Sequence, residues 1–94
     1  MGAGELVAQR LGIFVPWTVY ILQCSDNTLY TGITNDIEHR LEKHSNGTGA
    51  KYTRGRGPYK VFYTELYKTK GRALKREAQI KKLDRAGKLK LAVP

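Results

Sequence analysis

The stretch TVYILQCSDNTLYTGITND, residues 18–36, determines how this chain begins to fold. WTVYILQC at residues 17–24 and LYTGIT at residues 29–34 are rich in β-branched and aromatic side chains. Such runs predict β-strands, and the polar residues SDNT between them predict the turn of a β-hairpin. The hairpin contains two tyrosines, Tyr20 and Tyr30, and their phenols act together only if they share one face.

The length of the hairpin loop decides where the two phenols point. Because side chains alternate across a strand, an odd loop places Tyr20 and Tyr30 on the same face of the sheet. A two-residue turn at Asp26 and Asn27 places them on opposite faces instead. The sequence leaves both open. We predict an odd loop of about three or five residues, centred near Ser25 or Asp26.

The pattern after the hairpin predicts a helix, a third strand and a second helix. NDIEHRLEKH at 35–44 is typical of a helix with Asn35 as its N-cap. YKVFYTELY at 59–67 alternates as a strand does, and residues 69–87 have helical periodicity that ends near Gly87. The order β-β-α-β-α predicts a small α+β domain, in which helices flank a three-stranded antiparallel sheet.

The 94 residues of the chain are enough for one modest hydrophobic core. We predict an N-terminal tail over residues 1–16, a single domain over 17–85 and a C-terminal tail over 86–94. Residues 45–58 contain four glycines and a proline, which predicts a long loop. Long loops in compact domains are usually functional or disordered.

The charge of the chain is divided unevenly, and 17 lysines and arginines against 8 acids give a net charge of +9. Residues 1–50 hold three basic and five acidic side chains, a net of −2. Residues 51–94 hold fourteen basic and three acidic side chains, a net of +11, so the two halves together give +9. A half this basic favours a polyanionic partner. The alternative is a solvated, lysine-rich face.

The composition excludes several classes of protein. Cys24 is the only cysteine, so no internal disulfide forms, and with two histidines it makes no zinc site. Its apolar surroundings predict a core residue. No apolar stretch approaches the roughly 18 residues of a membrane span. The N-terminal residues lack the basic start and long apolar run of a secretory signal. We therefore expect a cytoplasmic protein without a membrane partner.

Three polar side chains occupy positions that suggest chemistry. Glu77 lies in the apolar arc of the second helix, where a carboxylate requires a cationic partner or a metal ion such as Mg²⁺. Arg40 and His44 are four residues apart on the first helix and point the same way. As an alternative, His44 is a cation that favours the helix C-terminus. Gly32, two residues after Tyr30, indicates close approach by a ligand or another backbone.

Taken in this order, the residues resemble the GIY-YIG nucleases, which are named after two tripeptides on the first two strands. The first tripeptide corresponds to residues 18–20 (Thr-Val-Tyr) and the second to residues 30–32 (Tyr-Thr-Gly). The family's helical arginine, its following histidine or tyrosine, and its metal-binding glutamate are matched by Arg40, His44 and Glu77.

The resemblance covers roughly residues 17–83 and is greatest to small single-domain bacterial proteins of the YhbQ type. Ile33 and Leu89 stand where the excision-repair relatives carry a lysine and an asparagine. The YhbQ-type motif H-x-x-G-x-G-A-K-Y-T-x-x-R-x-P is matched by His44, Gly47, Gly49, Ala50, Lys51, Tyr52, Thr53, Arg56 and Pro58.

The resemblance implies a divalent-metal-dependent DNA endonuclease, a hydrolase of phosphodiester bonds that prefers branched or nicked DNA and serves repair or recombination. It implies that a tyrosine is the general base, with Tyr20 the leading candidate and Tyr30 the second, assisted by His44. Arg40 would hold the scissile phosphate. Glu77 would bind Mg²⁺ or Mn²⁺ at the leaving oxygen.

The substrate would lie on the long loop and the basic second helix. The implied partners are DNA with branched, nicked or single-stranded regions and, because the domain is small, a targeting protein. The alternatives are a non-catalytic nucleic-acid-binding module with the same fold, and a domain that binds an acidic protein. The nucleic-acid contacts that we expect come from Gly32, Lys51, Tyr52, Thr53, Arg54, Arg56, Arg72 and Arg76.

Overall fold

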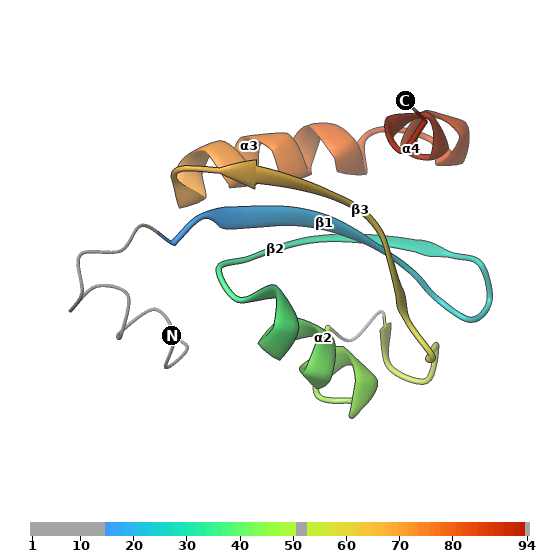
Figure 1. Ribbon diagram of the computed structural model, residues 1–94. Coiled ribbons are helices and arrows are strands. Elements are labelled where there is room, and N and C mark those ends of the chain that lie inside the picture. Colours follow the sequence, from blue (N-terminus) through green and yellow to red (C-terminus); the bar gives the residue numbers. More distant parts are fainter. Residues whose placement is uncertain (1–14, 51–52, 94) are drawn as a thin grey trace.

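The computed structural model describes residues 15–50 and 53–93. Its elements are β1 (Trp17–Gln23), β2 (Leu29–Thr34), α2 (Ile37–Ser45), β3 (Lys60–Tyr67), α3 (Lys70–Lys81) and α4 (Arg85–Leu91). The three strands form one antiparallel sheet in the order β2-β1-β3 (Figure 1). The predicted α+β fold is therefore confirmed.

The helices lie on both sides of the sheet, with α2 below it and α3 and α4 above it in Figure 1. The central strand β1 is buried on both faces. Val19 and Ile21 face α3 and form the hydrophobic core with Ala73 and Ile80 of that helix. Tyr20 is fully buried on the opposite face. In the described part of the chain, no helix is both long and apolar enough to cross a membrane.

The register of the hairpin places the two tyrosines on the same face. Tyr20 pairs with Gly32 across the strands, and Leu22 pairs with Tyr30. The loop is residues 24–28, an odd number centred on Asp26, as predicted. The rings of Tyr20 and Tyr30 lie 6.4 Å apart, centroid to centroid. The hairpin thus brings both phenols to the face that α2 covers.

The first helix begins one residue later than predicted. Asp36, not Asn35, is the N-cap of α2, and its carboxylate accepts a hydrogen bond from the backbone N–H of His39 at 3.2 Å. The backbone N–H of Asp36 bonds to the hydroxyl of Thr34 at 3.0 Å. These two bonds fix Asp36 at the start of the helix, where a carboxylate also complements the helix dipole.

The second predicted helix is two helices. α3 ends at Lys81, and α4 starts after Asp84, whose carboxylate accepts from the backbone N–H of Gly87 at 2.8 Å. Gly87 thus lies in the first turn of α4 rather than at a C-terminus, because Asp84 is a strong N-cap within the basic run. Most of α4 lies in the segment predicted as a C-terminal tail. Of the predicted N-terminal tail, residues 1–14 lie outside the described residues.

Candidate active site

A chain of hydrogen bonds runs through the space between the sheet and α2. The Tyr20 hydroxyl lies 3.1 Å from Nε2 of His44, and Nδ1 of His44 lies 2.7 Å from Oγ1 of Thr53. Oγ1 of Thr53 in turn donates to the carbonyl oxygen of Ala50 at 2.8 Å. Tyr20, His44 and Thr53 are at most 1% exposed. The chain is therefore shielded from water along its whole length.

The position of each proton in this chain of hydrogen bonds can be deduced from the bond between Thr53 and Ala50. A hydroxyl has one proton, and the Thr53 hydroxyl donates its hydrogen bond to the carbonyl oxygen of Ala50. Thr53 must therefore accept a hydrogen bond from Nδ1–H of His44. In a neutral imidazole this leaves Nε2 as an acceptor, and Tyr20 therefore donates its O–H to His44. Thr53 thus selects the tautomer of His44, and it holds the ring in position.

Arg40 links this buried chain to the second tyrosine. Its Nε donates to the Tyr20 hydroxyl at 3.4 Å, and its charge also interacts with the phenol of Tyr30. Among the described residues, no carboxylate forms an ion pair with Arg40. The structure therefore brings Tyr20, Tyr30 and His44 together around the guanidinium of Arg40. No carboxylate among the described residues neutralises the charge of this group.

Burial controls the protonation of the cluster. It raises the pKa of the Tyr20 phenol above its usual value, although the hydrogen bond and the charge of Arg40 oppose the rise. Burial also lowers the pKa of His44, and the positive charge of Arg40 lowers it further. Near neutral pH, Tyr20 therefore keeps its proton and His44 is neutral, which agrees with the proton positions derived above.

Two glycines allow this close packing. A Cβ at Gly32 would lie 2.5 Å from the Tyr20 hydroxyl oxygen, and one at Gly49 would lie 2.5 Å from Nδ1 of His44. Both distances are too short for any residue with a side chain to be accepted unchanged. The close approach predicted at Gly32 is thus made by the Tyr20 phenol. Gly32 is itself buried and has no surface for a nucleic-acid contact.

The loop between α2 and β3 packs around His44. The ring of Tyr59 lies 5.9 Å from that of His44, and its hydroxyl donates to the backbone carbonyl of Thr53. The prediction that Thr53 contacts nucleic acid is wrong, because its side chain is buried against His44. Lys51 and Tyr52, for which we also predicted contacts, lie outside the described residues.

The predicted arginines differ in their surroundings. Arg54 and Arg72 are exposed. Arg56 forms an ion pair with Asp26 of the hairpin loop at 2.5 Å. Arg76 donates to Glu65 through Nε at 2.9 Å and Nη2 at 3.1 Å, so its guanidinium connects α3 to β3.

Glu77 lies on the sheet-facing side of α3, as its position in the apolar arc predicts, and its side chain is 17% exposed. It forms an ion pair with Nζ of Lys81 at 3.5 Å, one helical turn later. Its negative charge is one of the smaller causes, after burial, that raise the pKa of Tyr20. In the described part of the chain, no three acidic, histidine or cysteine side chains gather into a metal site. Glu77 would therefore serve as a single protein ligand.

Two features of the site could not be predicted from the sequence. Thr53 belongs to the His44 motif, but only its burial and its hydrogen bonds show that it positions the histidine. Lys81 and Lys88 line a hollow with Tyr30, although Lys88 falls in the predicted tail. The basic run that contains both lysines was the available signal, but it does not say which of its members turn toward the strands.

Comparison with known proteins identifies the class. Residues 16–90 match the family model of the GIY-YIG catalytic domain. The match spans most of the chain, and the protein therefore belongs to the GIY-YIG family of nucleases.

Its relatives form a group of small proteins. A UPF0213 protein of Oceanobacillus iheyensis is 56% identical over 73 residues, which cover 78% of this chain and 85% of the relative. A UPF0213 protein of Clostridium perfringens is 58% identical over 73 residues, which cover 78% of each chain. The chain is thus similar to UPF0213 proteins over nearly their full length, in agreement with the predicted small single-domain group.

Solved structures support the fold. The solution NMR structure of a UPF0213 protein from Bacillus halodurans matches with a TM-score of 0.53 at 45% identity, and covers 81% of both chains. The solution NMR structure of a protein from E. faecalis matches with a TM-score of 0.58 at 42% identity, and covers 80% of both chains.

Proposed function

We propose that the protein is a divalent-metal-dependent endonuclease that hydrolyses phosphodiester bonds in DNA. One observation carries the proposal: Arg40 contacts two tyrosines and, within the described residues, has no carboxylate partner. A phosphate supplies the missing anion, and a guanidinium binds phosphate oxygens through paired donors. Membership of the GIY-YIG family supports the same chemistry.

We propose that Tyr30, rather than Tyr20, is the general base that activates the attacking water. Tyr20 is fully buried, and burial raises the pKa of its phenol, so it is a poor base at neutral pH. Tyr30 is half-buried, so water and substrate can reach its phenol more easily than that of Tyr20. Arg40 supplies positive charge beside it, where negative charge develops during attack. This order of the two tyrosines reverses the one predicted from the sequence.

Tyr20, His44 and Thr53 are positioning residues in this mechanism. Because the Tyr20 hydroxyl donates a hydrogen bond to His44, a lone pair of the Tyr20 oxygen is free to accept one from Nε of Arg40. The hydrogen-bond chain thereby fixes the guanidinium in one orientation toward the phosphate. Its burial makes these hydrogen bonds stronger than exposed ones, since little water competes for them.

Glu77 is the residue that we assign to the metal ion, Mg²⁺ or Mn²⁺. Its carboxylate fits this role, because its ion pair is long and its partner Lys81 is 51% exposed. Exposed pairs of this kind contribute little to stability, so a cation can replace the lysine. Mg²⁺ commonly takes one or two protein carboxylates, and substrate phosphate oxygens and waters complete its shell. When bound, the ion supplies charge stabilisation at the leaving oxygen.

The finer description of the substrate belongs to the same proposal. Arg54 and Arg72 present exposed guanidinium groups, and contacts to phosphates carry no information about base sequence. We therefore propose selection by structure, for branched or nicked DNA, in repair or recombination. A targeting protein and a cytoplasmic location complete the proposal.

The test uses labelled duplex, single-stranded, nicked, flapped and four-way-junction DNA with Mg²⁺, Mn²⁺ or EDTA. Wild type is compared with Glu77→Ala, with Glu42→Ala as control, because Glu42 is exposed on α2. We expect metal-dependent cleavage that is lost in Glu77→Ala and kept in the control. Binding without cleavage under every condition would instead identify a non-catalytic nucleic-acid-binding module.

A further inference from the structure

Two adjoining hollows run along the first half of β2, where this edge strand meets α3 and α4. One, of about 300 Å³, is lined by Leu29, Tyr30, Thr31, Lys81 and Lys88. The other, of about 200 Å³, shares Leu29 and Lys88 with the first and adds Thr28 and Arg85. We call these residues together the β2-edge groove.

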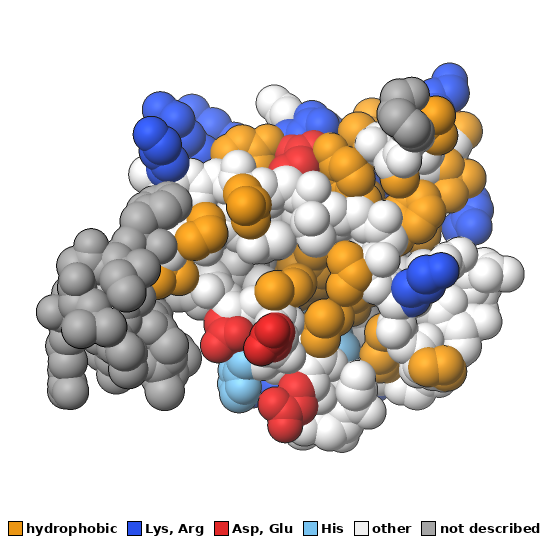
Figure 2. Space-filling model, viewed as in Figure 1, with side chains coloured by type: hydrophobic (Ala, Val, Ile, Leu, Met, Phe, Trp, Pro, Cys, Tyr) orange, Lys and Arg blue, Asp and Glu red, His pale blue; other side chains and the backbone are white. Residues whose placement is uncertain are grey.

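Among the described residues, the groove is lined by positively charged side chains and by no acidic one. Lys88 is half-buried, although its neighbour Lys90 on α4 is exposed, and no carboxylate in the described residues forms an ion pair with it. Arg85 donates through Nη1 to the backbone carbonyl of Asn27 at 2.5 Å, which fixes α4 against the hairpin loop. Figure 2 shows Lys and Arg side chains along the helix layer and at the right-hand end; most of the visible acidic side chains gather over α2, and one acidic patch lies within the helix layer.

Thr31 provides an independent sign of a ligand. The residue lines the larger hollow and is 3% exposed, and its hydroxyl oxygen has no hydrogen-bond partner among the described residues. A buried hydroxyl without a partner destabilises the folded state, because it has lost its hydrogen bonds to water. A ligand oxygen, or a water held by that ligand, would satisfy it.

The groove and the candidate active site adjoin at the edge strand β2, because Tyr30 lines the larger hollow and belongs to the site. We propose that the β2-edge groove holds the backbone of the DNA strand that flanks the scissile phosphate. Lys81 and Lys88 bind the flanking phosphate, Leu29 packs against sugar or base, and the Thr31 hydroxyl completes the polar contacts. The inference rests on the proposed function, and it gives α4 a role as one wall of the substrate path.

The size and charge of the groove favour a nucleic-acid strand over an acidic protein. Its larger hollow is at the low end of the 300–1,000 Å³ usual for small-molecule sites, so it accommodates about one nucleotide. An acidic peptide presents carboxylates at intervals set by its sequence, whereas a DNA strand presents a regular series with one phosphate per nucleotide. Lysines suit phosphates as point charges.

The test measures binding of a fluorescent flapped DNA by anisotropy in EDTA, across a salt titration, with the full chain. Lys88→Gln is compared with Lys90→Gln, since both lysines lie on α4 and both changes remove one charge. We expect Lys88→Gln to weaken binding about five-fold or more and to reduce the salt slope by nearly one, as the loss of one phosphate contact does. We expect Lys90→Gln to stay within about two-fold of wild type.

Thr31→Val gives a second reading that does not depend on charge. Valine has nearly the same shape and removes the unpartnered hydroxyl, so the melting temperature should stay the same or rise. Binding should nevertheless weaken by about two-fold or more, because the ligand loses a hydrogen bond. Equal affinity of Lys88→Gln and Lys90→Gln for the flapped DNA, together with unchanged affinity of Thr31→Val, would overturn the proposal that the groove binds DNA.

This experiment separates the groove from the nuclease. Loss of binding in Lys88→Gln, in a protein that never cleaves, supports the groove and refutes the nuclease. Cleavage by wild type with equal binding by the two lysine variants supports the nuclease and refutes the groove. Failure of wild type to bind any DNA refutes the groove.

Discussion

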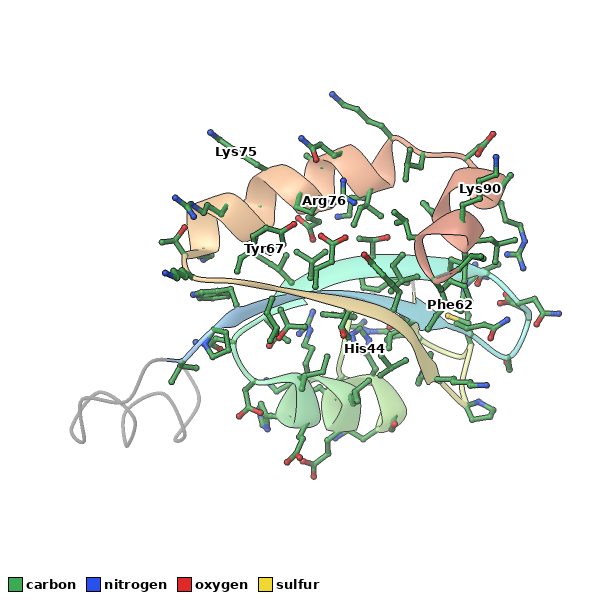
Figure 3. All side chains as sticks on the ribbon, turned by 45° about the horizontal axis from the view of Figure 1, so that its top comes forward. His44, Phe62, Tyr67, Lys75, Arg76 and Lys90 are labelled. Carbon is green, nitrogen blue, oxygen red and sulfur yellow. The ribbon has the colours of Figure 1, made fainter. Side chains whose placement is uncertain are left out.

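Two clusters of tyrosine and arginine lie on opposite sides of the same sheet, and they differ in one group. On the α2 side, Tyr20 and Tyr30 surround Arg40, with His44 behind them. On the α3 side, Tyr63 and Tyr67 lie beside Arg76. Figure 3 shows His44 between the sheet and α2, and Arg76 and Tyr67 between the sheet and α3. Among the residues that the structure describes, only the second cluster contains a carboxylate, that of Glu65.

Glu65 satisfies every member of its cluster. Its carboxylate accepts from Arg76 at 2.9 and 3.1 Å, from Tyr63 at 2.5 Å and from Tyr67 at 2.6 Å. Although burial by itself would raise its pKa, these hydrogen bonds hold the pKa of Glu65 at about 2. The cluster therefore joins β3 to α3 and leaves no charge available to a ligand.

The α2-side cluster has the same residue types without the acid. Arg40 donates to the phenol of Tyr20 and interacts with that of Tyr30, and neither phenol neutralises its charge. The difference teaches that an arginine among tyrosines has a structural role when a carboxylate of the same protein pairs with it. Without such a carboxylate, the arginine can bind an anionic ligand.

The largest effect on the cleavage rate is expected when the hydroxyl of Tyr30, the proposed general base, is removed. Tyr30→Phe should reduce the cleavage rate about 10²–10⁴-fold, the usual contribution of a general base. Tyr63→Phe, the matched change in the other cluster, should leave the rate within a few-fold of wild type. Single-turnover cleavage by both variants checks this. Equal rates for Tyr30→Phe and wild type would remove Tyr30 from the chemistry.

Glu65→Gln should lower stability by about 2 kcal/mol and the melting temperature by roughly 10 °C, because charged hydrogen bonds are lost. The folded-state pKa of Glu65 is about 2 and its ordinary value is 4.5, so its stabilisation is complete above pH 4.5. It is lost as the pH falls from there toward 2. Acid titration of unfolding should therefore show a smaller loss below pH 4.5 in the variant than in wild type. Identical acid titrations would contradict the role of Glu65.

Gly32→Ala should disturb only the α2-side cluster. The new Cβ would lie 2.5 Å from the Tyr20 oxygen, and overpacking of this kind costs about 1–3 kcal/mol. Displacement of the phenol also moves Arg40, so we expect cleavage to fall about ten-fold or more. Gly71→Ala on α3 is the control, because a Cβ there meets nothing within 4 Å. A fully active Gly32→Ala protein would show that the position of Tyr20 does not matter.

Thr53→Val should have the smallest effect, about a ten-fold loss of cleavage, since it removes the acceptor that selects the His44 tautomer. Thr53→Ser should restore most of the rate, because serine keeps the hydroxyl. The ¹⁵N chemical shifts of His44 provide a readout that loss of packing would not change: we expect the proton on Nδ1 in wild type and a mixture in Thr53→Val. A wild-type tautomer in the valine variant would exclude this role of Thr53.

Some of this organisation follows from the sequence, because it depends on local periodicity. Strand alternation and an odd loop place Tyr20 and Tyr30 together, and helical periodicity places Glu77 toward the sheet. The partner of Arg76 could not be predicted, since it depends on how β3 pairs with β1 across a bulge. The role of Thr53 depends on how a glycine-rich loop folds back on α2.

The short helix α4 shows a second limit of sequence reasoning. It spans only Arg85–Leu91, and its N-cap Asp84 lies in a basic run whose helical pattern continues from α3. A helix this short has little periodicity of its own, and its position depends on packing and on the bond from Arg85 to the hairpin loop. The groove that it forms with β2 was therefore not predictable.

The measurement that tests the central claim most directly is cleavage of flapped DNA with Mg²⁺ by Arg40→Ala and Arg76→Ala, with thermal unfolding of both. We predict that Arg40→Ala keeps a melting temperature near that of wild type and loses cleavage by about 10²-fold or more. Arg76→Ala should melt several degrees lower and, where folded, should cleave at close to the wild-type rate. Wild-type cleavage by Arg40→Ala would contradict the account, because the arginine without a carboxylate would then not be the one that binds the phosphate.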